Sequence, residues 1–153
     1  MIEGFHEDMV LRVSAEGKTK QDVLAFLAGT LCMAGYVKES YRDGILHREE
    51  IYPTGLATGH INVAVPHTDC EHVRENAIAV GLLDVPVSFR AMDDPSREVA
   101  VSIVIMLALK EPHGQVDMLQ KIIALVKRQD DLKRIVEAKE TKQAYQIIAG
   151  YLG

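Results

Sequence analysis

Apolar and polar residues alternate with two different spacings along the chain, and each spacing predicts one type of element. Residues 8–15 (DMVLRVSA) begin with short apolar alternation, which favours a strand. Residues 18–35 then change to helical spacing, with Thr19 and Asp22 as a capping box and Gly35 at the helix end. The apolar residues that carry this helical spacing are Val23, Phe26, Leu27, Leu31 and Ala34.

The middle of the chain predicts a second helix followed by strands. Residues 38–55 form the helical segment, which Pro53 and Gly55 end, so that Arg48 lies in its last turn or just beyond. Three later segments are apolar at nearly every position, which is typical of strands covered on both faces of a sheet. They are residues 61–66, 77–83 and 99–109, and residues 85–89 form a shorter strand candidate.

The C-terminal third is predicted to be helical. One apolar face after Pro112 carries Val116, Leu119, Ile122, Ile123 and Val126. A short helix follows in residues 130–138, and a last helix has Ala144, Ile147, Ile148 and Tyr151 on one stripe. Helices before and after a group of strands predict an α/β sandwich, a mixed sheet of about five strands with helices on both faces. We expect one domain over residues 1–153.

Composition restricts the kind of partner. The chain has 153 residues, of which 48% are hydrophobic, enough for one substantial core. Its net charge of -5 disfavours nucleic acid and anionic membranes, which attract basic surfaces, and favours a basic protein partner. The two cysteines, Cys32 and Cys70, lack paired spacing, so we expect no disulfide framework and a reducing, cytoplasmic location.

No segment of the sequence resembles a signal peptide or a membrane span. The N-terminus (MIEGFHEDMV) is acidic and lacks a basic-then-apolar pattern. The longest apolar run, residues 99–109, is about half of the roughly 20 residues that a spanning helix needs. We therefore expect no direct membrane insertion.

His67 is the main candidate for chemistry. It follows Pro66 at the end of an apolar strand, and proline cannot donate to a strand ladder. The imidazole is therefore turned toward the edge of the sheet, where it can be both supported and reachable. From its position alone, His67 could also be an ordinary exposed histidine in a turn, with no chemical role.

Metal and phosphate sites are the other chemistries that these residues suggest. His60, His67, Cys70 and His72 could supply zinc ligands, but alternation along the strand points His60 and His67 to opposite faces, and no zinc spacing is present. Gly55 and Gly59 lack the remaining residues of a nucleotide-binding loop and indicate only a tight turn. We expect no metal and no cofactor.

Residues 47–69 (HREEIYPTGLATGHINVAVPHTD) together resemble the active-site signature of enzyme IIA domains of the bacterial sugar phosphotransferase system, fructose/mannitol class. The shared features are an Arg-Glu stretch, a Thr-Gly turn, a glycine-containing loop and an apolar strand ending in Pro-His. Pro53-Thr54-Gly55 is most similar to the galactitol-type branch. The resemblance extends over nearly the whole chain in element order and length.

The resemblance implies a protein-to-protein phosphotransferase. His67 would accept a phosphoryl group from the phosphohistidine of the carrier HPr. It would then pass the group to a cysteine of an enzyme IIB, which serves a IIC membrane permease for a hexitol such as galactitol. Arg48 would hold the phosphoryl oxygens with its planar donor fork. Thr54, Gly55 and Thr68 would belong to the loop that meets the partner.

The sequence departs from the mannitol and fructose pattern at one position. Those members have a second histidine at the start of the helix after the last strand, and alignment on Leu119 and Ile122 places Gln115 there. His113 lies two residues earlier. Either side chain could support the phosphoryl group beside the helix N-terminus, or both could simply cap the helix.

Two other functions stay open on the sequence alone. The chain could be a regulatory IIA whose phosphorylation state is a signal, although the Pro-Thr-Gly turn favours hexitol transport. It could also be a metal-binding or interaction module in which His67 has no chemical role.

Overall fold

The computed structural model describes residue 2 and residues 4–153, which form an α/β domain with five strands and five α-helices. The strands are β1 (Val10–Val13), β2 (Gly55–Leu56), β3 (Asn62–Ala64), β4 (Ala77–Arg90) and β5 (Glu98–Ala108). The helices are α1 (Lys20–Met33), α2 (Ser40–Ile51), α3 (Pro112–Val126), α4 (Gln129–Glu137) and α5 (Thr141–Leu152). Two short 3-10 helices, η1 (Glu7–Met9) and η2 (Cys70–His72), complete the described elements.

The five strands form one mixed sheet, as the sequence predicts, and their order is β1-β4-β5-β3-β2. β4 and β5 pair antiparallel at its centre, and β1 and β3 add to them in parallel. β2, which the sequence does not predict, pairs antiparallel with β3 at the edge. Residues 77–83 of β4 and residues 103–108 of β5 are buried on both faces of the sheet, and this burial explains their continuous apolar sequence.

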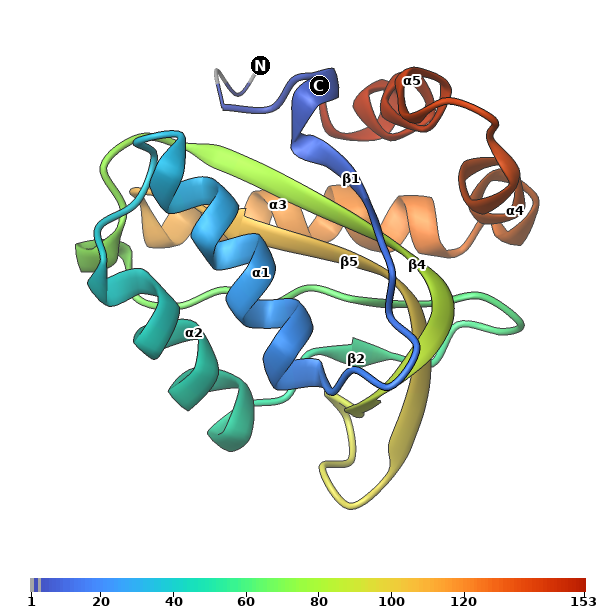
Figure 1. Ribbon diagram of the computed structural model, residues 1–153, viewed down its shortest axis with the longest axis horizontal. Helices are drawn as coiled ribbons and strands as arrows, with labels where there is room; N and C mark the ends of the chain where they lie inside the picture. Colours follow the sequence, from blue (N-terminus) through green and yellow to red (C-terminus); the bar gives the residue numbers. More distant parts are fainter. Residues whose placement is uncertain (1, 3) are drawn as a thin grey trace.

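The helices divide into two groups, one on each face of the sheet (Figure 1). α1 and α2 pack together in front of the sheet, whereas α3, α4 and α5 contact one another and α5 also contacts β1. The C-terminal end of α2 and the N-terminal end of α3 therefore lie on opposite faces of the sheet. This arrangement brings Arg48 and Gln115 toward the edge where β3 ends.

Local signals at α1 are confirmed, except that Phe26 and Ala34, two of the five apolar residues expected to share its buried face, are exposed. Thr19 and Asp22 form the reciprocal capping box, and Gly35 has a φ of 86° beyond the helix end. Phe26 was expected on the buried face but is 50% exposed. Leu24 and Ala28 are buried instead, because the sheet contacts a face of the helix rotated away from Phe26.

Two further expectations are wrong in detail. Residues 85–89 are not a separate strand but the second half of β4, which continues through an irregularity in its pairing between Leu82 and Val87. On α3, Val116 and Ile123 are exposed. The residues of α3 that reach the core are Met118, Ile122, Leu125 and Val126.

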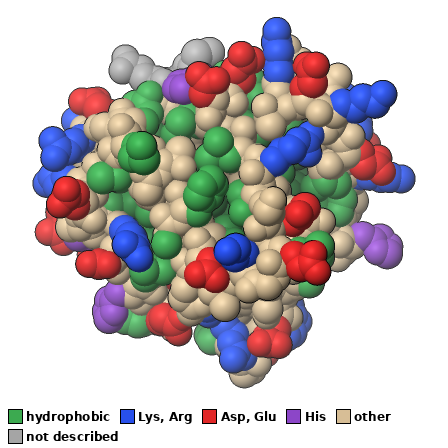
Figure 2. Space-filling view, in the orientation of Figure 1, with side chains coloured by type: hydrophobic (Ala, Val, Ile, Leu, Met, Phe, Trp, Pro, Cys, Tyr) green, Lys and Arg blue, Asp and Glu red, His purple; other side chains and the backbone are tan. Residues whose placement is uncertain are grey.

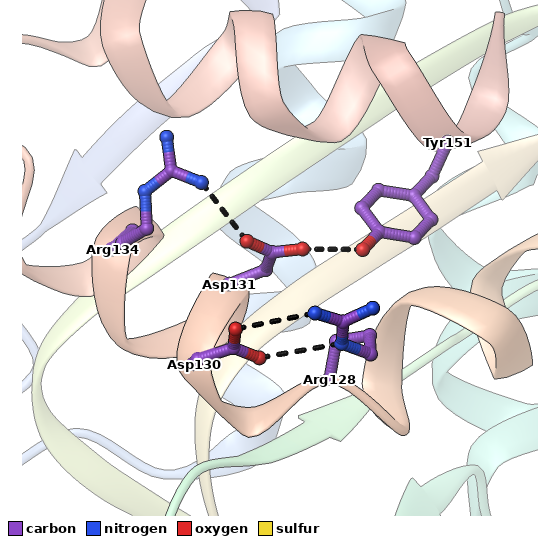
Figure 3. A network of polar contacts seen from close by, with 5 residues as sticks. All are labelled: Arg128, Asp130, Asp131, Arg134 and Tyr151. Carbon is purple, nitrogen blue, oxygen red and sulfur yellow. Dashed lines mark hydrogen bonds and ion pairs between the residues drawn. The ribbon is translucent and has the colours of Figure 1, made fainter.

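A polar network joins α4 to α5 at the far end of the chain (Figure 3). The Tyr151 hydroxyl and Arg134 Nη1 both donate to the Asp131 carboxylate, the latter over 2.9 Å, and Arg128 pairs with Asp130. A surface hollow of about 910 Å³ runs along these two helices, lined by residues that include Glu137 and Lys139. This region contains no residue predicted to carry chemistry.

The surface carries mixed charge. Figure 2 shows hydrophobic side chains interspersed with acidic and basic ones on the face that α1 and α2 cover. In residue 2 and residues 4–153, no helix is long and apolar enough to cross a membrane. The same residues contain no group of three or more His, Cys, Asp or Glu side chains that could hold a metal ion.

Candidate active site

His67 lies where β3 leaves the sheet. Val65 and Pro66 continue from β3 as buried residues, and the Pro66 carbonyl oxygen accepts a hydrogen bond of 3.0 Å from the Leu107 N–H of β5. Pro66 has no N–H to extend the pairing, so the chain turns outward at this point. The half-buried His67 side chain is thus held by a rigid strand but reaches the surface.

The hydrogen bonding of His67 selects one tautomer. Its Nδ1 lies 2.9 Å from the Val65 carbonyl oxygen, which can only accept, so Nδ1 carries the proton. Burial is the main cause that holds the pKa of His67 below its ordinary value of 6.5, and the positive charge of Arg48 acts in the same direction. The neutral imidazole therefore has its free lone pair on Nε2.

Arg48 is in the last turn of α2, as predicted, and it is only partly engaged. Its Nη1 lies 3.4 Å from the Asp69 Oδ1, and its guanidinium carbon lies 4.7 Å from the centroid of the Tyr52 ring. Its buried Nε has no hydrogen-bond partner among the residues that the structure describes. Asp69 engages only one terminal nitrogen of a side chain that is 37% exposed, so the guanidinium can still donate to an anion beside His67.

The structure separates the two candidates on α3. The Gln115 Nε2 donates to the Thr68 carbonyl oxygen over 3.1 Å and lies 3.7 Å from the Cys70 Sγ. Gln115 is therefore attached to the loop that follows His67. The His113 side chain is 89% exposed and its Nε2 lies 3.6 Å from the Asp117 carboxylate on the same helix, so it points away from that loop.

Thr54, Gly55 and Thr68 lie beneath the surface rather than on it. Thr54 is 2% exposed, and Thr68 is 5% exposed. A Cβ on Gly55 would lie 2.6 Å from the Arg90 carbonyl oxygen, so only glycine fits there. These three residues are therefore the buried part of the loop and support its backbone, rather than forming its exposed surface.

Three residues with contacts at the site were missed by the sequence reasoning. Asp69 and Tyr52 both contact Arg48, and Glu49 has a buried carboxylate that accepts hydrogen bonds from Thr54. The only signal for Asp69 was its place two residues after His67. Nothing in the polar run of residues 47–50 indicates that Glu49, rather than Glu50, is buried.

Comparison with known proteins assigns the class to which this fold and site belong. Residues 3–151 match the family described as "Phosphoenolpyruvate-dependent sugar phosphotransferase system, EIIA 2". The chain belongs to this family, whose members relay phosphoryl groups between proteins on a histidine.

Individual relatives within the family are distant. The galactitol-specific EIIA component of Escherichia coli K12 is 26% identical over 123 residues, 80% of this chain and 81% of that protein. The nitrogen regulatory protein of Pseudomonas aeruginosa is 26% identical over 138 residues, 89% of this chain and 86% of that protein. The mannitol enzyme IIA of E. coli, solved in complex with phosphorylated enzyme IIB, has a TM-score of 0.75 and 20% identity, covering 95% of this chain and 97% of that one.

The tautomer of His67 can be tested directly by nitrogen NMR. At neutral pH the ring should be neutral, with a protonated Nδ1 and an unprotonated Nε2, because Val65 accepts from Nδ1. Protonation of the ring should require a pH below the ordinary histidine value of 6.5, because burial lowers the pKa of His67. Protonated Nε2 as the neutral form would contradict this geometry.

Proposed function

We propose that the chain is the IIA component of a sugar phosphotransferase system that carries a phosphoryl group on Nε2 of His67. The observation that carries this proposal is the 2.9 Å contact of Nδ1 with the Val65 carbonyl, which leaves Nε2 as the nucleophile. In the first step the Nε2 lone pair attacks phosphorus, and the phosphorus–nitrogen bond to the histidine of HPr breaks. In the second step an enzyme IIB thiolate attacks phosphorus, and the bond to Nε2 breaks.

The surrounding residues support such a transfer without a metal ligand set. Arg48 supplies positive charge and free donors, and Gln115 presents its amide in the first turn of α3, where helix N–H groups also favour an anion. Transfer between imidazole and thiolate requires alignment and charge stabilisation more than proton removal. In the unphosphorylated protein the Asp69 carboxylate contacts Nη1 of Arg48, and the incoming phosphoryl group would replace it there.

Partner proteins would dock over exposed apolar side chains next to these residues. Ile51 is 51% exposed and Tyr52 60% exposed at the end of α2, and Val116 is 53% exposed beside Gln115. Together with the acidic net charge they suit a basic carrier such as HPr and, in turn, enzyme IIB with its IIC permease. We propose that residues 1–153 act as one cytoplasmic domain in this relay.

The substrate of the transport system is proposed to be a hexitol such as galactitol. Pro53-Thr54-Gly55 and the 26% identity to the galactitol-specific component support this choice. The equal identity to a nitrogen regulatory protein supports a second role, in which the phosphorylation state is a signal. Rapid transfer of the label from this protein to a galactitol-type enzyme IIB would favour transport, and a phosphorylated form that no such IIB discharges would favour regulation.

Replacement of His67 tests the phosphoacceptor. Labelled phosphoenolpyruvate with enzyme I and HPr should give an acid-labile label on the wild-type protein and none on His67→Ala. His60→Ala is the matched control, because His60 lies on the exposed loop before β3. Retained labelling of His67→Ala would falsify the assignment.

Replacement of Arg48 tests the phosphoryl contact. Arg48→Lys keeps the charge but loses the planar fork, so transfer from HPr should slow by about tenfold or more while the urea midpoint changes little. Arg42→Lys, on the exposed side of α2, is the control. Wild-type transfer in both Arg48→Lys and Arg48→Ala would exclude the role.

Paired replacements on α3 test which side chain supports the transfer. Gln115→Ala should slow transfer on the order of a hundredfold if its amide stabilises the phosphoryl oxygens, and His113→Ala should have little effect. Gln115→His should be tolerated, because an imidazole N–H can donate from the same place. A severe defect in His113→Ala with near-normal Gln115→Ala would show the reverse assignment.

A further inference from the structure

A carboxylate is buried behind the strand that presents His67. Glu49 and Thr54 are each 2% exposed, and Thr68 is the third buried polar residue in the described part of the chain. Burial of a carboxylate is costly unless its oxygens are hydrogen-bonded, so its partners indicate what it holds in place.

Both Glu49 oxygens are engaged by Thr54. The backbone N–H of Thr54 donates to Oε2 over 2.8 Å, and its hydroxyl donates to Oε1 over 2.9 Å. Because the hydroxyl gives its single hydrogen to Glu49, its lone pairs are free to accept. They receive the Val65 N–H over 3.2 Å, and the Thr54 carbonyl oxygen shares that donor over 3.3 Å.

Val65 is thereby fixed on one side by Thr54 and bound to the reactive histidine on the other. Its N–H is held by Thr54, and its carbonyl oxygen accepts from His67 Nδ1. The next carbonyl, of Pro66, accepts from Leu107 of β5. A rotation of the backbone at Val65 would therefore misdirect the carbonyl that selects the His67 tautomer.

We propose that Glu49 is a positioning residue for phosphoryl transfer, which acts through the Thr54 hydroxyl and Val65 to fix the orientation and tautomer of His67. The inference rests on the proposed function of His67 as phosphoacceptor. Glu49 has no contact with the phosphoryl group in this account, and its effect is transmitted by three hydrogen bonds. Loss of its charge should therefore change the alignment of His67 rather than the chemistry of Nε2.

The protonation of Glu49 gives this positioning role a pH signature. Burial raises the pKa of Glu49 to about 7. The two hydrogen bonds from Thr54 and the positive charge of Lys20 on α1 oppose this rise, whereas the negative charge of Glu50 on α2 adds to it. The ionised carboxylate accepts charge-assisted bonds from both Thr54 donors, whereas a protonated carboxyl group keeps only one strong acceptor oxygen for the two of them. Alignment of His67 should therefore improve as pH rises through about 7.

Stability should change in the opposite direction. The folded-state pKa of about 7 lies above the ordinary value of 4.5, so between these values the folded protein holds a proton that the unfolded chain has released. The contribution of Glu49 to the free energy of unfolding consequently falls as pH rises through this window. If Glu49 only stabilised the fold, the transfer rate and the free energy of unfolding would change in the same direction with pH. The proposed positioning role predicts that the transfer rate rises with pH while the contribution of Glu49 to the free energy of unfolding falls.

The experiment compares Glu49→Gln with Glu50→Gln, its exposed neighbour, in single-turnover transfer from phospho-HPr at about pH 6 and about pH 8. Expressing each rate relative to Glu50→Gln at the same pH cancels the titration of HPr. Wild type should match Glu50→Gln at the higher pH, where Glu49 is ionised in both; at the lower pH Glu50→Gln should be slightly faster, because loss of the Glu50 charge lowers the Glu49 pKa. Glu49→Gln should be about tenfold slower than either protein at the higher pH and closer to both at the lower one. Thr54→Val should be slow and Thr54→Ser, which keeps the hydroxyl, should recover the wild-type profile.

A second readout on unphosphorylated protein keeps the inference separate from the proposed function. The His67 Nδ1–H signal in nitrogen NMR should persist in Glu50→Gln and Thr54→Ser and weaken in Glu49→Gln and Thr54→Val. If the wild-type protein accepted no phosphoryl label, the proposed function would be rejected. The His67 Nδ1–H signal would then decide by itself whether Glu49 positions the ring. An unchanged His67 signal, or a Glu49→Gln rate equal to the control at both pH values, would overturn the inference.

Discussion

The hydrogen bond from His67 Nδ1 to the Val65 carbonyl oxygen connects the buried sheet to the exposed chemistry. It requires a carbonyl that does not take part in the sheet ladder, a chain that leaves the sheet at the next residue, and a ring that stays neutral. Pro66 provides the second condition, since it cannot donate to a neighbouring strand. The partial burial of the ring contributes to the third by lowering its pKa.

The charged groups near His67 are arranged so that the unphosphorylated site is only loosely paired. Arg48 contacts Asp69 over a long 3.4 Å, rests against the Tyr52 ring and retains an unpartnered Nε. Exposed pairs of this kind contribute little to stability, so the guanidinium can exchange Asp69 for a phosphoryl group at low cost. An arginine fully satisfied by carboxylates would have to lose strong bonds before it could assist transfer.

Sequence reasoning predicted the architecture because its main signals are local. The capping box at Thr19, the stop at Pro53 and the apolar strands all act within a few residues, and the structure agrees with them. Phe26, Val116 and Ile123 were misplaced because their exposure depends on the angle at which a helix meets the sheet. That angle is a tertiary property, which helical periodicity does not contain.

The site was predictable only in part for a similar reason. His67, Arg48 and Gln115 could be proposed from motif and register, and in the structure the Gln115 side chain of α3 donates a hydrogen bond to the loop after His67. Glu49 could not, because Glu49 and Glu50 are chemically identical neighbours and only the packing of α2 buries one of them. Long-range contacts such as Thr54 with Val65 span 11 positions and leave no spacing signature.

The central claim is that Nε2 of His67 carries the phosphoryl group, and through-bond phosphorus–nitrogen NMR of the phosphorylated, nitrogen-labelled protein tests it most directly. The account predicts a coupling between phosphorus and Nε2 of His67, with Nδ1 still protonated. A coupling to Nδ1 of His67, or to a nitrogen of any other residue, would contradict it.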